Sequence, residues 1–212
     1  MLDNRFEKCE KVFTLGYHVG QFKMPKEYVD LLNVDFDEHL RKKSLPSHSK
    51  SLAGEVKDEW NVTNILNKAV LEFFNGCVQT YIANTSQKHH ARGYTLYMNS
   101  CWINDQVENE YNPLHIHHGR GPLGLSSVLF LRVPESITNA KSTNPSEEPK
   151  DGRLEFISQM GDVYGNPTAL ITPKVGDLYI FPYNLHHTVY PFKGQGIRRS
   201  LSFNVDTPLN NG

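Results

Sequence analysis

Histidine is concentrated in one short stretch of the chain, residues 112–119, which reads N-P-L-H-I-H-H-G. The stretch contains His115, His117 and His118, three of the ten histidines of the chain. On a β-strand, the side chains of residues i and i+2 project from the same face about 6–7 Å apart. Neutral imidazoles are good ligands for transition metals, so the stretch predicts that His115 and His117 approach one metal ion.

A third ligand must come from elsewhere, and the downstream pair His186 and His187 offers one. Adjacent residues of a strand face opposite sides, so only one of the two can reach the metal. The cysteines are too scattered for a closed zinc site. Three ligands on one face of a metal would leave the opposite face open, as Fe(II) oxygenases require; their usual protein ligands are two histidines and one carboxylate.

The segments that must position these histidines have the pattern of short strands. From residue 94 onward, runs rich in β-branched and aromatic residues alternate with Gly, Pro, Asn and Asp. Eight such runs at roughly regular intervals predict a sandwich or jelly-roll barrel. We expect strands at residues 94–104, 114–118, 123–133, 154–157, 169–172, 177–181, 187–191 and 197–205. The polar insert 134–152 lacks apolar periodicity and predicts a mobile lid or a disordered excursion.

The first third of the chain predicts a bracing layer. Residues 11–20 have the composition of a strand, and Pro25 is suited to the start of a short amphipathic helix. Residues 65–82 carry apolar side chains at three- and four-residue steps, which predicts a helix that packs on a sheet, with Thr63 or Asn61 as its N-cap. We therefore expect a single domain over residues 1–212, with a strand and helical layer (1–92) on a β-roll (93–206).

Composition excludes several classes of function. The chain has 212 residues and a formal net charge of −1, without the basic patch of a nucleic-acid-binding protein. No apolar run approaches the roughly 18–20 residues that span a bilayer. Three cysteines without paired spacing, Cys9, Cys77 and Cys101, indicate reduced thiols. These features predict a cytoplasmic protein that binds neither nucleic acid nor membrane.

Five motifs resemble, in the same order, those of the 2-oxoglutarate- and Fe(II)-dependent oxygenases of bacteria and their phages, within the prolyl 4-hydroxylase-like superfamily. They are H-I-H at 115–117, L-S-S-V-L-F-L at 125–131, G-D-L-Y-I-F-P at 176–182, H-T-V-Y-P at 187–191 and R-R-S-L-S-F-N at 198–204. The resemblance covers residues 102–206. It implies a mainly β fold with N-terminal helices around a double-stranded β-helix (jelly-roll, cupin-like) core, and a dioxygenase that uses Fe(II) and 2-oxoglutarate, with a prolyl residue of a peptide as one possible substrate.

The resemblance also implies site residues. His115 matches the first metal ligand and His187 the distal one, because His187 rather than His186 fills the histidine position of H-x-V-x-P. His117 stands where the superfamily usually has Asp or Glu, so a third neutral imidazole takes the place of a carboxylate. His118 points to the other strand face and is a weaker candidate.

The dicarboxylate co-substrate needs a cation, and a guanidinium pairs with a carboxylate bidentately. Strand parity places Arg198 with Ser200, Ser202 and Asn204, and places Arg199 with the apolar positions of the same run. The motif R-x-S also selects Arg198, with the Ser200 hydroxyl as a second donor. Trp102 and Asn104 match a W-x-N pattern that would line the pocket. Residues 105–111 and 134–152 are expected to flank its mouth.

Two other functions fit the same residues. One is a β-roll binding or structural module, such as a phage-encoded protein, whose metal site is vestigial. The other is a cupin-type dioxygenase that uses three histidines without 2-oxoglutarate. In that case replacing Arg198 would leave the activity intact.

Overall fold

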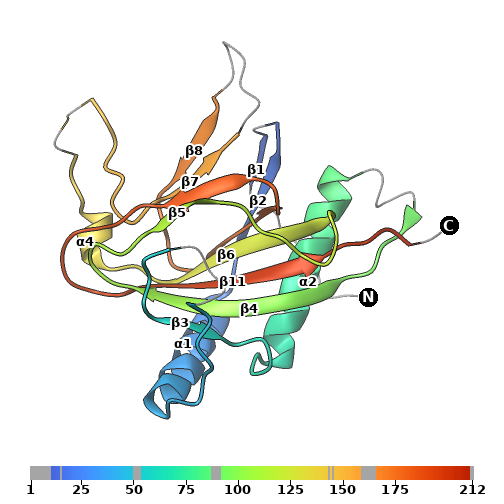
Figure 1. The fold of residues 1–212 in the computed structure, drawn as a ribbon, viewed down its shortest axis with the longest axis horizontal. Coiled ribbons are helices and arrows are strands. Elements are labelled where there is room, and N and C mark those ends of the chain that lie inside the picture. The colour runs from blue at the N-terminus through green and yellow to red at the C-terminus, as the bar shows by residue number, and fades with distance from the viewer. Residues whose placement is uncertain are drawn as a thin grey trace.

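The computed structural model describes residues 11–14, 16–49, 54–86, 92–142, 144, 146–158 and 166–210 of the chain (Figure 1). Two long helices occur early in the chain, and most strands follow them. In chain order the elements are β1 Lys11–Thr14, β2 His18–Lys23, α1 Lys26–Arg41, β3 Glu59–Asn61, α2 Lys68–Thr85, β4 Tyr97–Gln106, β5 Asn112–His115, β6 Gly124–Arg132, α4 Glu135–Thr138, β7 Leu154–Ile157, β8 Thr168–Ile171, β9 Asp177–Pro182, β10 His186–Val189 and β11 Arg198–Asp206.

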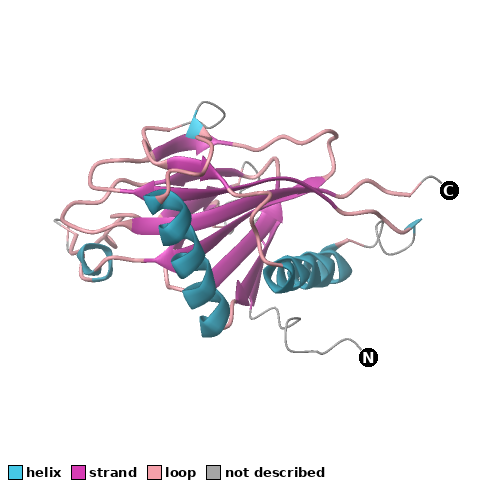
Figure 2. Ribbon diagram, turned by 90° about the horizontal axis from the view of Figure 1, so that it is seen from below, coloured by secondary structure: helices cyan, strands magenta, loops and turns pink. Residues whose placement is uncertain are grey.

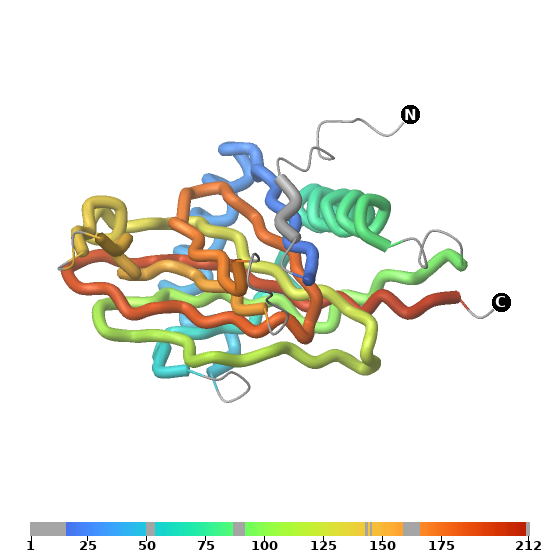
Figure 3. Tube along the Cα trace, turned by 90° about the horizontal axis from the view of Figure 1, so that it is seen from above, coloured from blue at the N-terminus to red at the C-terminus, as the bar shows by residue number. Residues whose placement is uncertain are grey.

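The strands form two antiparallel sheets that face each other. The larger has the order β1-β2-β9-β6-β11-β4-β3 and the smaller the order β5-β10-β7-β8. Seen from above, β7 and β8 pass in front of the strands of the larger sheet (Figure 3). Aromatic and aliphatic side chains of both sheets, among them Phe130, Phe156 and Phe181, form one buried cluster. This arrangement confirms the predicted double-stranded β-helix core.

Both long helices lie across the outer face of the larger sheet (Figure 2). The predicted apolar stripe of α2 is buried there, including Phe73, Phe74 and Cys77. The helix begins later than the sequence indicated. Its N-cap is Asn67, whose side chain accepts a hydrogen bond from the backbone N–H of Ala69 at 2.8 Å. The predicted caps were wrong because apolar periodicity continues into residues that precede the helix.

The N-terminal segment joins the larger sheet directly. The sequence predicted one strand over residues 11–20, and the structure instead has the hairpin β1–β2. Its turn includes Gly16, whose positive φ of 70° suits a residue without a Cβ. The second strand pairs with β9, from Gly20 opposite Ile180 to Lys23 opposite Asp177.

Alternation along β11 separates two environments. All nine residues of this strand, which lies between β6 and β4, are buried. Leu201, Phe203 and Val205 belong to the apolar cluster beneath the helices. The residues between them face the smaller sheet, as strand parity predicted. This polar face of β11 is one wall of the candidate site.

Other expectations are met in part. The insert after β6 begins with α4, where a lid or disorder was expected, and its residues Pro134 and Ser136 pack against Gly196 and Gly194. Cys77 and Cys101 are both buried, as was predicted for Cys77 on the apolar stripe of α2, and Cys9 lies outside the described residues. None of the helices in the described part of the chain is long and apolar enough to span a membrane.

Candidate metal and co-substrate site

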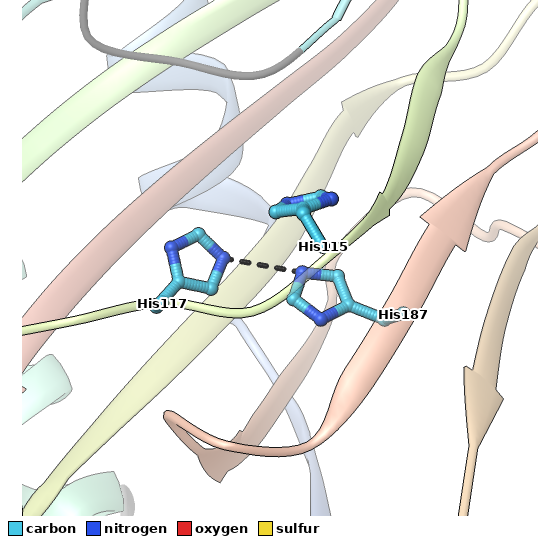
Figure 4. Close-up of side chains that lie close together, drawn as sticks. All are labelled: His115, His117 and His187. Carbon is cyan, nitrogen blue, oxygen red and sulfur yellow. Dashed lines mark hydrogen bonds between the residues drawn. The ribbon is translucent and has the colours of Figure 1, made fainter.

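Three histidines, two in strands and one in a loop, converge between the sheets. His115, the last residue of β5, is the register partner of His187 in β10. His117 lies beyond the end of β5, and its backbone N–H donates to the carbonyl of Tyr183 at 2.9 Å. One ring nitrogen of each histidine lies within 4.8 Å of the others. Figure 4 shows the three rings pointing toward one another. The predicted grouping is present, although His117 reaches it from a loop and not from the strand.

Backbone carbonyls orient two of the rings. The Nδ1 of His115 donates to the carbonyl of Pro113 at 2.7 Å, and that of His187 donates to Leu185 at 2.9 Å. Because a carbonyl oxygen only accepts, each Nδ1 carries the proton and each Nε2 keeps a lone pair. The Nε2 atoms of His117 and His187 are 3.1 Å apart. The Nε2 lone pairs of His115 and His187 are thus available to a metal ion.

Burial keeps these imidazoles neutral. It lowers the pKa of His117 to about 3, and the neighbouring His115 adds to the effect. It lowers the pKa of His187 well below its ordinary value, again with His115 contributing. It also lowers the pKa of His115, against the opposing hydrogen bond to Pro113. Neutral imidazole is the metal-binding form. The donor set therefore fits a divalent transition metal at neutral pH, with coordination positions left for other ligands.

No carboxylate or thiolate joins this group among the described residues. His118 and His186 also lie outside it, as strand parity predicted. The three histidines of this group are those that the sequence indicated, and their role as metal ligands stays a prediction. The departure of this group from two histidines and one carboxylate is present in three dimensions as well.

The histidines line a small cavity of about 40 Å³ that is partly open to solvent. Its wall comes mainly from β4, β5, β6, β10 and β11. It includes Trp102, Asn104, Asn112, Ser127, Val128, Leu154, Phe181, Val189, Arg198, Ser200 and Ser202. Residues 105–111 and 134–152 contribute no described residue to this lining, and their position beside the mouth stays a prediction. Both segments adjoin the ends of strands at the Arg198 end of the cavity, where β4 pairs with β11.

Among the residues that the structure describes, Arg198 is a buried cation without a counter-ion in this cavity. Its side chain is among the largest of the fully buried side chains that the structure describes, at 2% exposure. Nη1 donates to Gln106 Oε1 at 3.2 Å, and the guanidinium lies over the Phe130 ring, 4.9 Å from its centroid. Nε and Nη2 are buried without a partner among the described residues. Burial lowers its pKa to about 10, which leaves it charged at neutral pH. Two free N–H groups of one guanidinium fit a carboxylate.

Arg199 is on the other face of the strand and is fully paired. Its Nε and Nη2 donate to the two carboxylate oxygens of Asp105 at 2.6 and 2.5 Å, and its Nη1 donates to Asp37 at 2.8 Å. Both arginines are buried, since Arg198 and Arg199 are 2% and 1% exposed. Ser200, the other predicted co-substrate residue, is also 2% exposed and lines the cavity with Arg198.

Trp102, which lines the cavity, makes an aromatic contact with His48 that the sequence did not indicate. Trp102 lies between two imidazoles, with its ring centroid 5.8 Å from that of His117 and 5.4 Å from that of His48. His48 is in a segment rich in Ser and Lys, which has no pattern that would predict such a contact. Its backbone N–H donates to the carbonyl of Glu59 in β3 at 2.8 Å, which holds it beside the larger sheet.

A protein-family model described as "Putative 2OG-Fe(II) oxygenase" matches residues 100–204, the segment that contains the three histidines and Arg198. Residues 100–204 belong to this family. The predicted enzyme class, a 2-oxoglutarate- and Fe(II)-dependent oxygenase, is therefore confirmed. Among curated protein sequences none matches the chain.

Solved structures share the fold of this oxygenase at low sequence identity. A prolyl-4-hydroxylase from Pseudomonas putida has a TM-score of 0.56 at 15% identity, over 91% of this chain and 93% of that one. The viral collagen prolyl hydroxylase vCPH from Paramecium Bursaria Chlorella virus-1 has 0.55 at 13%, over 88% and 94%. The non-heme alpha ketoglutarate dependent carbocyclase SnoK, from nogalamycin biosynthesis, has 0.59 at 13%, over 92% and 81%. Prolyl hydroxylases and a carbocyclase are thus about equally similar, so the fold does not select a substrate.

Proposed function

We propose that the oxygenase holds Fe(II) through His115, His117 and His187, holds 2-oxoglutarate through Arg198 and Ser200, and hydroxylates a prolyl residue of a peptide or protein. The observation that carries the proposal is one cavity with neutral imidazoles directed inward in one part of its wall and an unpaired guanidinium in another. A metal site alone would not need the guanidinium. A dicarboxylate that must reach a metal needs both.

Each group has a separate task. The carbonyls of Pro113 and Leu185 fix the ring orientations of His115 and His187, so metal binding needs little rearrangement there. Arg198 would bind the distal carboxylate of 2-oxoglutarate through its two free N–H groups, and the Ser200 hydroxyl would add a donor. With Fe(II) bound, 2-oxoglutarate and dioxygen supply the oxidation: the co-substrate becomes succinate and carbon dioxide, and one oxygen atom enters the substrate.

The apolar part of the wall keeps water from the reacting atoms. Leu154, Phe181 and Val189 are buried and line the cavity beside the histidines. The Phe181 ring packs against His187 at 4.8 Å between centroids, nearly edge to face. A reactive oxidant is therefore enclosed by side chains that hold the ligand rings and carry no exchangeable proton.

The peptide substrate is supported by the edge of the smaller sheet. Leu114, adjacent to His115 in β5, is 54% exposed, and Tyr111, just before this strand, is 39% exposed. β5 is the edge strand of its sheet, and exposed apolar residues on an edge suit an extended peptide. Two of the similar structures described above are named as prolyl hydroxylases. A small-molecule substrate is the alternative.

Succinate formation tests the activity directly. The protein is incubated aerobically with 2-oxoglutarate, with and without Fe(II), and succinate is measured together with metal and 2-oxoglutarate binding by calorimetry. We expect Fe(II)-dependent turnover that is abolished by His115→Ala and retained by His118→Ala. Absence of both turnover and binding would contradict the proposal and favour an inactive binding module.

The substrate class needs its own experiment. Peptides with a central proline are compared with the same peptides carrying alanine at that position. The proposal expects that only the proline peptides stimulate turnover of 2-oxoglutarate and gain 16 mass units, the mass of one oxygen atom. Equal stimulation by both series would exclude prolyl hydroxylation and leave the family chemistry in place.

A dioxygenase with three histidine ligands and no 2-oxoglutarate is the second candidate. The replacement of the usual carboxylate by His117 favours it. The unpaired N–H groups of Arg198 argue for the first candidate, because the second has no use for them. Activity that persists in Arg198→Ala without added 2-oxoglutarate would favour the second.

A further inference from the structure

Three polar side chains form a row across the larger sheet, on the face that is directed at the smaller one. Glu59 of β3 is the register partner of Asn104 in β4, and Asn104 is the register partner of Ser200 in β11. Directly opposite residues of antiparallel strands share a face, with Cβ atoms about 4.5–5.5 Å apart. Asn104 and Ser200 line the cavity. Glu59 therefore extends this wall of the cavity to β3, at the border of the sheet.

Three buried oxygen atoms of this region lack a hydrogen-bond donor among the described residues. They are Oε1 of Glu59, Oδ1 of Asn104 and Oδ1 of Asn112. Glu59 and Asn104 are 3% and 6% exposed. Asn112, in β5 of the smaller sheet, lines the cavity together with Asn104. A buried acceptor without a donor lowers stability, so a ligand that donates to these atoms recovers that free energy.

Glu59 also has no counter-ion in the described part of the chain. Burial raises its pKa to about 7, and the neighbouring Glu110 adds to the shift. Glu110 is 6% exposed, and its carboxylate accepts hydrogen bonds from backbone N–H groups. The backbone N–H of His48 donates to the carbonyl of Glu59, but burial lowers the pKa of this imidazole, which is therefore neutral at pH 7. This border of the cavity thus has uncompensated negative charge, opposite in sign to that of Arg198.

Neither 2-oxoglutarate nor dioxygen can satisfy these groups. Both lack a hydrogen-bond donor at neutral pH, and Glu59 repels the two carboxylates of 2-oxoglutarate. The primary substrate, which receives the oxygen atom, is the remaining component of the reaction. The segment that contains Glu59 adjoins the proposed peptide edge, because the N–H of Glu55 donates to the carbonyl of Tyr111 at 3.0 Å, just before β5.

We propose that Glu59, Asn104 and Asn112 bind a positively charged group of the primary substrate, and that the substrate peptide carries a lysine or arginine near the residue that is oxidised. The inference rests on the proposed function and adds the charge that its substrate must carry. An ammonium has three N–H donors and a guanidinium has five. Either one supplies the donors that the three oxygen atoms lack and the counter-charge that Glu59 lacks.

Peptide binding measures this preference without turnover. The full chain is mixed with Mn(II), a divalent ion that is stable in air, and with 2-oxoglutarate, and peptides are titrated by calorimetry. The peptides share one sequence with a central proline and carry lysine, norleucine or glutamate at one flanking position at a time. Norleucine keeps the methylene chain of lysine and removes the charge.

The lysine peptides should bind best. At one or more positions we expect a Kd at least tenfold lower for lysine than for norleucine, about 1.4 kcal/mol, with glutamate the weakest. Kd values for lysine and norleucine that agree within about threefold at every position would overturn the proposal.

Glu59→Gln and Glu55→Gln form a matched pair. Both remove one carboxylate from the same segment, but Glu55 is exposed. Glu59→Gln should reduce the preference for lysine over norleucine to about threefold or less, and Glu55→Gln should retain it. An amide at residue 59 keeps the size of the side chain and can still hydrogen-bond to Asn104. An unchanged lysine preference in Glu59→Gln would therefore contradict the proposal and assign Glu59 to a hydrogen bond within the wall.

The outcomes separate this inference from the function on which it rests. A lysine preference shared by peptides with proline and with alanine at the centre would keep the charge preference and exclude prolyl hydroxylation. Fe(II)-dependent succinate formation without binding of any peptide would exclude this inference and leave the oxygenase activity in place. The comparison of lysine with norleucine uses the unchanged chain, so it can overturn the proposal even if Glu59→Gln does not fold.

Discussion

Arg198 and Arg199 are consecutive residues of β11, both are buried, and they meet opposite conditions. On the helix side of the larger sheet, Arg199 is paired with Asp105 and Asp37. On the side facing the smaller sheet, Arg198 retains two N–H groups without a partner among the described residues. The same side chain, at the same depth, is neutralised on one face and uncompensated on the other.

This difference separates a structural charge from a functional one. A buried charge that only supports the fold requires a counter-charge, because removing it from water is otherwise too unfavourable. Asp105 supplies that counter-charge within the sheet, and Asp37 of α1 ties the helix to it. A buried charge that is left unpaired lowers stability, and a ligand that supplies the counter-charge restores the lost free energy.

The largest effect on stability should come from removing the ion pairs of Arg199, on the face of β11 that is directed at the helices. Arg199→Met leaves the carboxylate of Asp105, which is 5% exposed, buried without its cation. We expect the free energy of unfolding in urea to fall by about 3–5 kcal/mol. The double variant Arg199→Met with Asp105→Leu should recover most of the loss. Equal instability of the single and double variants would show that the ion pair is not the cause.

Replacing Arg198, on the face of β11 that is directed at the smaller sheet, should change ligand affinity and not stability. Arg198→Met should weaken 2-oxoglutarate binding at least 100-fold, about 2.7 kcal/mol, because the carboxylate loses its charged partner. Its free energy of unfolding should stay the same or rise, since an uncompensated charge has been removed. Calorimetry and urea unfolding measure the two quantities. A large loss of stability would contradict the contrast between the two arginines.

As the pH is lowered, the first loss of stability should come from the buried histidines of the cavity. In the unliganded protein, burial keeps His117 and His187 neutral, with the pKa of His117 lowered to about 3. The unfolded chain takes up protons near pH 6.5 and the folded chain does not, so stability falls as the pH drops below that value. From pH 7.5 to 5.5 the loss is about 1.4 kcal/mol for each such histidine. Urea unfolding of His187→Asn should show a pH dependence smaller by that amount.

The ion pair between Arg199 and Asp37 should keep its contribution to stability down to a lower pH. Burial alone would raise the pKa of Asp37, but hydrogen bonds from Arg132 and Arg199 outweigh it and lower the pKa. The stability from this pair is present above the ordinary value of 3.8 and is lost only as the pH falls through the lowered pKa. A stability loss between pH 7.5 and 5.5 that is unchanged in His187→Asn would assign it to other groups.

The smallest effect should be that of a single hydroxyl beside Arg198. Ser200→Ala should weaken 2-oxoglutarate binding about three- to tenfold, the contribution of one hydrogen bond, roughly 0.5–1.5 kcal/mol. Ser202→Ala, two residues further along the same face, should have a smaller effect. If the two variants changed places, Ser202 would be the donor to the co-substrate.

Strand parity predicted the arrangement of β11 well because a two-residue period depends only on local geometry. It assigned Arg198 and Ser200 to one face and Arg199 to the other, and it separated His187 from His186. The motif order then brought His115 and His187 together, and the structure places them opposite each other in register. Sequence was sufficient wherever the pattern lay within one strand.

Features that depend on contacts between distant segments could not be predicted. His117 lies beyond its strand, and the carbonyl of Tyr183, far along the chain, holds its backbone. His48 reaches Trp102 from a segment without periodicity. The counter-ions of Arg199 come from α1 and β4, and no local pattern links them. Arg198 has no counter-ion in the described part of the chain, and this feature, which carries the functional argument, is likewise visible only in three dimensions.

The hairpin β1–β2 has a consequence for how the molecule can be divided. β2 is hydrogen-bonded to β9, and β3 to β4, so strands from the first third of the chain occupy both borders of the larger sheet. A fragment cut to the segment that carries the chemistry would have β9 and β4 as bare borders and an uncovered apolar face beneath the helices. Such borders recruit other chains. The segment that carries the candidate site therefore depends on β2 and β3 to keep its edge strands from pairing with other chains.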